Sequence, residues 1–259
     1  MSVYSGLFQL TGQKAIVTGA ASGLGKTLAQ GLAEYGATVS AWDLDGAGAA
    51  NTAREITDQG GCASARQCDV ADAVAVRSAV AAEIEEHGPI DILVTSAGIG
   101  MRAPAEAMTD EQWSRVLGVN LTGTWNCSQA VGRAMIEHKV AGRIVNIASI
   151  AGLVGLTTGN ANYAATKGGV IALMRTLAIE WAPFGIRVNA IAPTHFRTPL
   201  IEKAIAENPK TLDYFLGNIP LGRLGEPADI VGPGVFLCST ASGMVTGHVL
   251  VVDGGHTAR

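Results

Sequence analysis

The chain has 259 residues, of which 48% are hydrophobic and 15% are charged, and its formal net charge at pH 7 is −4. This length fits one large domain or two small ones, and the composition allows a sizeable buried core. The small negative charge, without a long basic run, argues against nucleic acid as a partner, and no apolar run is long enough to predict a membrane span.

Short β-branched runs alternate along the chain with longer segments of helical periodicity. The predicted strands cover residues 14–18, 38–42, 64–70, 91–98, 143–149, 186–193 and 248–255. The predicted helices cover residues 24–36, the fifties up to Gly60, 73–87, 109–135 and 163–182. Thr109 is a suitable N-cap for the fourth of these helices, because Gln112 follows three residues later.

This alternation predicts an α/β fold, namely one doubly wound Rossmann-type domain over residues 1–259. A parallel sheet with helices on both faces is the arrangement that such an element order favours. Ligands of such sheets bind at the carboxyl ends of the strands. The N-terminus shows no secretory signal and the four cysteines form no CxxC motif, so we expect reduced thiols in a cytoplasmic protein.

The residues TGAASGLG, 18–25, follow the first predicted strand and open the first predicted helix. Glycines let the backbone turn sharply and approach a pyrophosphate, whose charge is attracted to the helix N-terminus. A tight turn without a ligand is the alternative interpretation. The predicted cofactor contacts in this loop are Gly19, Ser22, Gly23, Leu24 and Gly25.

Asp43 ends the second predicted strand. Its carboxylate can accept hydrogen bonds from an adenosine ribose and would repel a 2′-phosphate, which favours NAD over NADP. The alternative is a solvated aspartate in a turn, and the nearby cation Lys26 is the remaining argument for NADP. Asp69 and Val70 follow the third predicted strand and can hold an adenine ring, the first through its carboxylate and the second as an apolar wall.

Tyr163 and Lys167 lie four residues apart in a predicted helix, so their side chains share one face. The ordinary pKa of a tyrosine phenol is about 10, too high for acid–base catalysis at pH 7. We expect the ammonium of Lys167 to lower the pKa of Tyr163. Tyr163 can then exchange a proton with an alcohol or a ketone, and Lys167 can bind the cofactor ribose. A surface Tyr–Lys pair is the alternative interpretation.

Three other positions favour the catalytic interpretation. Ser149 ends a predicted strand, where its hydroxyl can orient a substrate oxygen. Asn120 is a poor helix former inside a predicted helix, and it can tether a water that relays protons to Lys167. The small residues TSAG end the fourth predicted strand, where Ala97 and Gly98 would let the cofactor approach the backbone.

These residues together make the chain resemble the short-chain dehydrogenase/reductase family over essentially its whole length. TGAASGLG resembles the family's TGxxxGxG, TSAG resembles its NNAG with both asparagines replaced, and TGHVLVVDGG resembles its TG…VDGG. Asn120, Ser149, Tyr163 and Lys167 fall on the family's catalytic tetrad.

The resemblance implies a seven-stranded parallel sheet, a homotetramer and a nicotinamide cofactor. It also implies cofactor contacts at Pro193 and Thr198. The family's Pro-Gly pair after the sixth strand is here Pro193–Thr194. We expect the substrate lid at about residues 194–222.

The segments PTHFRTPL and GNIPLGRLGEPADIVGPGVFLCSTAS resemble the subgroup that acts on sugar acids and polyols, such as gluconate 5-dehydrogenases. Arg102 follows the fourth predicted strand and can clamp a sugar-acid carboxylate; the alternative is a solvated arginine or an ion pair with Glu106. His195 can donate to substrate hydroxyls, or it is simply exposed. The predicted substrate contacts are Arg102, Ser149, Tyr163 and His195.

The sequence therefore predicts an NAD(H)-dependent enzyme that interconverts a secondary alcohol and a ketone on a sugar acid or polyol, with no metal site. One alternative is a 3-oxoacyl-[acyl-carrier-protein] reductase, which would use NADPH and present a basic patch to its partner. The other is an NAD-sensing regulatory protein without turnover. Such proteins tend to lose the tyrosine or the lysine, and this chain has both.

Overall fold

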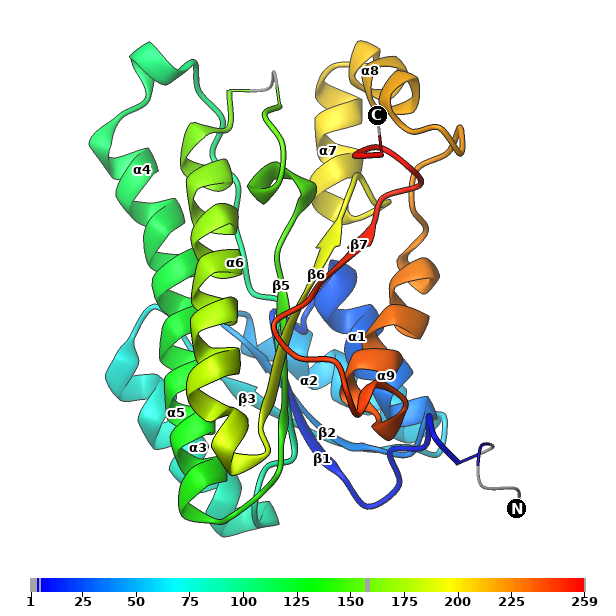
Figure 1. Cartoon of the computed structure of the whole chain (residues 1–259). Helices are drawn as coiled ribbons and strands as arrows, with labels where there is room; N and C mark the ends of the chain where they lie inside the picture. The colour runs from blue at the N-terminus through cyan, green and yellow to red at the C-terminus, as the bar shows by residue number, and fades with distance from the viewer. Residues whose placement is uncertain (1–3, 5, 157–158, 259) are drawn as a thin grey trace.

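The computed structural model describes residues 4, 6–156 and 159–258. Its centre is a seven-stranded parallel sheet in the order β3-β2-β1-β4-β5-β6-β7, which confirms the predicted doubly wound fold (Figure 1). The chain winds outward from β1 to one edge and from β4 to the other, so the switch point lies between β1 and β4. The strands are β1 Lys14–Thr18, β2 Thr38–Asp43, β3 Cys62–Gln67, β4 Ile92–Thr95, β5 Arg143–Ile147, β6 Arg187–Pro193 and β7 Val249–Val252.

Helices cover both faces of this sheet (Figure 1). Successive side chains of a strand point to opposite faces. Ile16 therefore belongs to an apolar cluster with α3, α5 and α6, whereas Val17 belongs to a second cluster with α1, α2 and α9. The helices are α1 Gly23–Glu34, α2 Gly46–Asp58, α3 Ala73–His87, α4 Asp110–Leu117, α5 Gly123–Glu137, α6 Ala161–Trp181, α7 Pro199–Glu207, α8 Lys210–Asn218 and α9 Val231–Cys238.

Several predicted strands end earlier than expected. The strand predicted at 91–98 ends at Thr95, since the hydroxyl of Thr18 accepts hydrogen bonds from the amides of Ser96 and Ala97 at 3.2 and 3.3 Å. The strand predicted at 248–255 covers only Val249–Val252. The third strand was predicted two residues too late at its start.

The helix predicted over 109–135 is divided by one π-helical segment, Gly118–Thr122, between α4 and α5. The predicted capping box of Thr109 and Gln112 is confirmed. Wide π turns are common at functional sites. This one contains Asn120, whose side chain is fully buried.

Helices α7, α8 and α9 have no counterpart in the sequence analysis, which assigned only a lid to residues 194–222. α7 and α8 stand over the carboxyl ends of β6 and β7, beside the C-terminal turn (Figure 1). They share a small apolar cluster of their own, centred on Phe215, Ile219 and Leu224. The region predicted as a lid is thus built as a separate helical layer.

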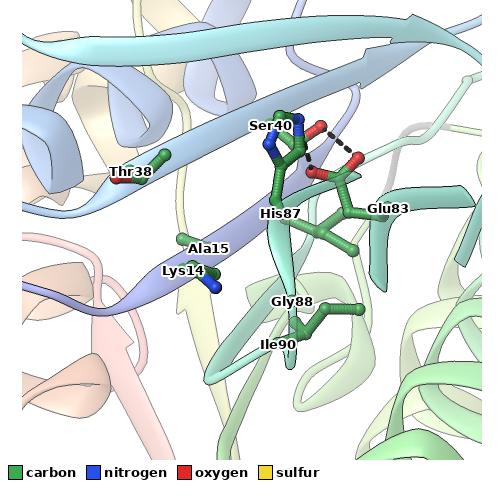
Figure 2. A pocket seen from close by; sticks show the side chains of 9 residues that line it. Lys14, Ala15, Thr38, Ser40, Glu83, His87, Gly88 and Ile90 are labelled. Carbon is green, nitrogen blue, oxygen red and sulfur yellow. Dashed lines mark hydrogen bonds and ion pairs between the residues drawn. The ribbon is translucent and has the colours of Figure 1, made fainter. Parts of the chain in front are cut away.

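Figure 2 shows a small pocket at the amino ends of β1 and β2, opposite the edge where the predicted site lies. Ser40 donates a 2.9 Å hydrogen bond to the buried carboxylate of Glu83, whose other oxygen lies 3.8 Å from Nε2 of His87. The cavity volume is about 10 Å³, the space of roughly one water molecule. It is too small for a nucleotide or a sugar.

Within the described ranges, no helix is long and apolar enough to cross a membrane.

Candidate active site

The predicted glycine loop joins the carboxyl end of β1 to the N-terminus of α1. Gly19 and Gly23 have φ values of 70° and 55°, which favour glycine over other residues. A Cβ on Gly25 would lie 2.0 Å from the carbonyl oxygen of Gly19, so a side chain there would break the turn. Ser22 is the N-cap of α1, and the structure gives its side chain no capping hydrogen bond. The first amides of α1, including that of Leu24, therefore face this edge as donors for an anion.

Asp43 lies at the end of β2, beside this loop. Its Oδ2 accepts the amide of Ala21 at 3.0 Å, and its Oδ1 accepts the amide of Asp45 at 2.9 Å. These two bonds orient the carboxylate and leave lone pairs for further donors, because a carboxylate offers about four acceptor sites. Lys26 is occupied nearby by an ion pair of 2.7 Å with Glu55.

Asp69 and Val70 follow β3 on the same edge. Asp69 is exposed, and its carboxylate accepts the amide of Ala71 at 2.9 Å. Val70 is buried, and its side chain packs against Gly123 at the start of α5, where an added Cβ would come within 2.6 Å. Asp69 is thus accessible to a ligand, whereas most of the Val70 surface is used by the helix.

The loops that follow β4 and β6 close on the glycine loop. A Cβ on Gly19 would lie 2.7 Å from Cα of Ala97, and one on Gly23 would lie 3.6 Å from the side chain of Thr198. Pro193 is the last residue of β6. The structure therefore brings the predicted cofactor contacts after β1, β4 and β6 to one edge of the sheet.

Asn120 and Lys167 meet the loop after β4. Asn120 donates to the carbonyl of Ile99 at 2.9 Å and accepts the amide of Ile99 at 2.8 Å. A Cβ on Gly98 would lie 3.4 Å from Oδ1 of Asn120 and 3.9 Å from Nζ of Lys167. The amide side chain of Asn120 thus holds this loop in place, a contact that the sequence analysis did not anticipate.

Tyr163, Ser149 and Lys167 form a compact group between β5 and α6. The phenol of Tyr163 shares a hydrogen bond with the hydroxyl of Ser149. Nζ of Lys167 lies 5.5 Å from the centroid of the Tyr163 ring and donates to the carbonyl of Ile147 at 2.7 Å. The expected common face of Tyr163 and Lys167 is confirmed.

The expected effect of Lys167 on the phenol is wrong. Burial raises the pKa of Tyr163 above its ordinary value, while the hydrogen bond from Ser149 and the positive charge of Arg102 oppose that rise. Burial also lowers the pKa of Lys167 to about 8, because an ammonium loses hydration inside the protein. At Tyr163 the loss of hydration outweighs both the hydrogen bond from Ser149 and the charge of Arg102.

Arg102 acts electrostatically on two other candidate site residues, although it comes from the loop after β4 and His195 comes from the loop after β6. The charge of Arg102 acts on both Tyr163 and His195. Arg102 is exposed, and in the described part of the chain it forms no ion pair with Glu106. His195 is half-buried and stacks on Phe215 with ring centroids 3.6 Å apart, so it is not a freely exposed histidine.

The sequence analysis missed Asn162, which organises the start of α6. Its buried Nδ2 donates to the carbonyls of Met101 and Gln112 at 3.1 and 3.2 Å, and its Oδ1 accepts the amide of Tyr163 at 2.7 Å. Asn162 thus ties the loop before Arg102 to the helix that carries Tyr163. An asparagine next to the start of a helix was the signal in the sequence.

This arrangement fits a dinucleotide. The tight glycine turn, the amides at the start of α1 and the carboxylate of Asp43 match a pyrophosphate followed by a ribose. Lys167 links this edge to the phenol, because its Nζ lies near Gly98 and 5.5 Å from the centroid of the Tyr163 ring. Among the described residues, no cluster of His, Cys, Asp and Glu side chains could hold a metal ion.

Known proteins are similar to this chain in sequence and in fold. Residues 19–257, which include every candidate site residue, match a family model described as enoyl-(acyl carrier protein) reductase. The D-threitol dehydrogenase of Mycolicibacterium smegmatis is 43% identical, over 97% of this chain and 95% of that protein. The gluconate 5-dehydrogenase of Gluconobacter oxydans is 41% identical, over 97% of each. A crystal structure of a gluconate 5-dehydrogenase from Burkholderia cenocepacia in complex with NADP and tartrate is 40% identical, with a TM-score of 0.93 over 98% of each chain.

Proposed function

Because this chain belongs to the short-chain dehydrogenase/reductase family, we propose that it oxidises a secondary alcohol of a polyol or sugar acid reversibly to the ketone, with NAD(H). The observation that carries the proposal is the contact between the phenol of Tyr163 and the hydroxyl of Ser149, one helical turn from the buried ammonium of Lys167. The relatives act on related compounds, as their names state.

The roles of these residues follow from their positions. When bound, a nicotinamide dinucleotide supplies the acceptor or the donor of the hydride. Ser149 orients the substrate oxygen, and Tyr163 takes the hydroxyl proton in oxidation or returns it to the carbonyl in reduction. Lys167, one helical turn from Tyr163, supplies a donor for the ribose. Asn120 holds the loop at Ile99, and its part in a proton relay to Lys167 stays a proposal.

Replacing Tyr163 by phenylalanine tests this assignment. The phenol carries the proton in every turnover, so we expect kcat to fall by at least about 100-fold. The NAD dissociation constant, measured by fluorescence titration, should change less than about threefold, because the ring and Lys167 remain. Retention of more than a tenth of the wild-type kcat would contradict the role of Tyr163.

The choice of NAD over NADP is proposed from Asp43 and its surroundings. Asp43 is oriented toward the loop by two backbone amides, and Lys26 is neutralised by Glu55. A 2′-phosphate would therefore meet a carboxylate without a free cation from Lys26. Since a related structure contains NADP, membership of the family leaves the choice open. We expect NAD to be used at least about tenfold better than NADP by kcat/KM, and Asp43→Ala to narrow that ratio. Equal use of both by the wild type would defeat this role.

The substrate class is tested by a panel of polyols, sugar acids and acyl-thioester ketones, followed through nicotinamide absorbance. Turnover of D-threitol or gluconate supports the proposal. Turnover of the acyl thioesters alone would instead favour the acyl-carrier-protein reductase. Binding of NAD without turnover of any member would favour a sensing protein. Arg102, whose charge acts on both Tyr163 and His195, and His195 itself are the proposed substrate contacts, under a lid of residues 194–222 in a domain spanning 1–259.

Assembly as a homotetramer is proposed from the outer faces of α4, α5 and α6. On these helices Trp113, Trp125 and Ile179 are 40%, 38% and 75% exposed, and a subunit interface would bury them. All four cysteines are free thiols, which supports a reducing compartment such as the cytoplasm. Light scattering of the purified protein would test the tetramer.

A further inference from the structure

The C-terminal turn meets the loop after β6 through a pair of side chains, Thr194 and His256. The hydroxyl of Thr194 lies 3.0 Å from Nδ1 of His256, across 62 positions of the sequence. Thr194 stands where the resembling family has glycine, which has no side chain for such a bond. We infer that this pair positions an imidazole wall, made by His256 and His195, which recognises substrate hydroxyls next to the reacting carbon.

The turn that carries His256 is tightly held. Asp253 accepts the amides of Gly255 and Thr257 at 2.9 and 2.7 Å, and also the hydroxyl of Thr257 at 2.7 Å. The amide of Thr194 donates to the carbonyl of Val252 at 3.2 Å. Because both partners of the Thr194–His256 bond are anchored by backbone, the imidazole has a defined place.

The same turn is joined to the base of the lid. The amide of Leu221 donates to the carbonyl of Gly254 at 3.1 Å. A Cβ on Gly254 would come within 2.7 Å of Ile219, a member of the lid's apolar cluster. Figure 1 shows the C-terminal turn beside α7 and α8, above the carboxyl ends of the strands. His256 therefore lies where the base of the lid, the end of β7 and the loop after β6 meet.

His195 completes the wall. Its ring stacks on Phe215 at a centroid distance of 3.6 Å and an angle of 20°, and it lies 5.9 Å from the ring of His256. The amide of Gly225 donates to its backbone carbonyl at 3.0 Å. Thr194 and His195 are adjacent in sequence, so a shift of Thr194 away from His256 would also move the His195 ring.

The chemistry of the wall suits hydroxyl groups. Burial, with the charges of His256 and Arg102, lowers the pKa of His195 to about 4, so its imidazole is neutral at pH 7. A neutral imidazole has one donor and one acceptor nitrogen, and a hydroxyl is both donor and acceptor. A carboxylate can only accept, and Arg102 is the group that would suit it. The wall thus selects for neighbouring hydroxyls whether or not the substrate is acidic.

This inference rests on the proposed function, and its test uses variants of the pair in the full-length protein. Thr194→Val keeps the shape of the side chain but removes the hydrogen bond, Thr194→Ser retains the hydroxyl, and His256→Phe retains an aromatic ring. The control is His138→Ala, an exposed position at the C-terminal end of α5. Initial rates are measured with D-threitol, gluconate and 2-butanol, an alcohol without neighbouring hydroxyls.

We expect Thr194→Val and His256→Phe to raise KM for D-threitol and gluconate about tenfold, with kcat changed less than threefold. KM for NAD and kcat/KM for 2-butanol should stay within about twofold, and Thr194→Ser should restore the wild-type KM. If the pair had only a structural role, the variants would change kcat/KM for all three alcohols and the NAD affinity together.

The inference would be overturned if both variants kept the wild-type KM for D-threitol and gluconate. It would also be overturned if kcat/KM for 2-butanol fell by the same factor as kcat/KM for D-threitol and gluconate. In either case turnover of D-threitol by the wild type would leave the proposed function standing. If the wild type turns over only acyl-thioester ketones, both proposals fail. Variants that bind NAD with wild-type affinity count as folded, and His256→Phe, which removes the other partner of the hydrogen bond, serves where Thr194→Val does not fold.

Discussion

Lys167 is expected to cost the protein stability while it serves catalysis. Its side chain is 5% exposed, and burial lowers its pKa from an ordinary 10.5 to about 8. Between pH 8 and pH 10.5, Lys167 is therefore protonated in the unfolded chain and mostly deprotonated in the folded chain. The free energy of unfolding therefore rises with pH in this window, by about 1.4 kcal/mol for each pH unit. From pH 7 to pH 9.5 the contribution of Lys167 is about 2 kcal/mol.

Replacing Lys167 by methionine removes this charge and keeps most of the volume. At pH 7 the variant should be more stable by about 1–2 kcal/mol, since relief from burying a charge exceeds the loss of the hydrogen bond to the carbonyl of Ile147. Turnover should be lost. The difference in unfolding free energy between the variant and the wild type should then shrink by about 2 kcal/mol as the pH rises to 9.5.

The assay is urea unfolding followed by circular dichroism, at half-unit pH steps from 7 to 9.5. The control is Lys203→Met, because the Lys203 side chain is 75% exposed and its charge is hydrated in both states. The reasoning is refuted if the pH profiles of Lys167→Met and the wild type run parallel, as those of Lys203→Met and the wild type should.

Three further predictions concern other buried polar groups. The pKa of His195 is lowered in the folded protein, so its protonation favours the unfolded chain. The unfolding free energy of the wild type should therefore fall by about 2 kcal/mol as the pH drops from 6.5 to 4. His195→Phe keeps an aromatic ring on Phe215 and should not show this fall. Asn162→Ala should lower the urea unfolding free energy by about 2 kcal/mol and reduce kcat, because the start of α6 loses its ties. Ser40→Ala should cost about 1–2 kcal/mol by removing the donor to Glu83, with kcat/KM unchanged at this opposite edge of the sheet.

Local patterns in the sequence determined the alternation of strands and helices, and also the glycine loop. The strand 14–18 and the helix 73–87 were predicted to the residue. The shared face of Tyr163 and Lys167 was predicted as well. Each of these features depends on residues within a few positions of one another, so backbone periodicity and steric rules are enough to reveal them.

The carboxyl ends of the strands were also placed correctly as a group. In a parallel sheet all these ends lie on one edge, so residues that follow different strands line the same edge. Asp43, Ala97 and Ser149 lie along one edge of the sheet for this reason. The end of β4 was missed, because the side chain of Thr18, from β1, binds the loop that follows β4.

Only the tertiary structure decided the contacts between distant segments. The side chain of Asn120, in a π turn, hydrogen-bonds the backbone of Ile99. The charge of Arg102 acts on both Tyr163 and His195. The hydroxyl of Thr194 hydrogen-bonds His256, near the end of the chain. The sign of the pKa shift of Tyr163 belongs here too, since it depends on burial by several elements at once. Such pairings follow from how helices and loops pack in three dimensions, and no spacing along the chain encodes which of the many possible neighbours a polar side chain will meet.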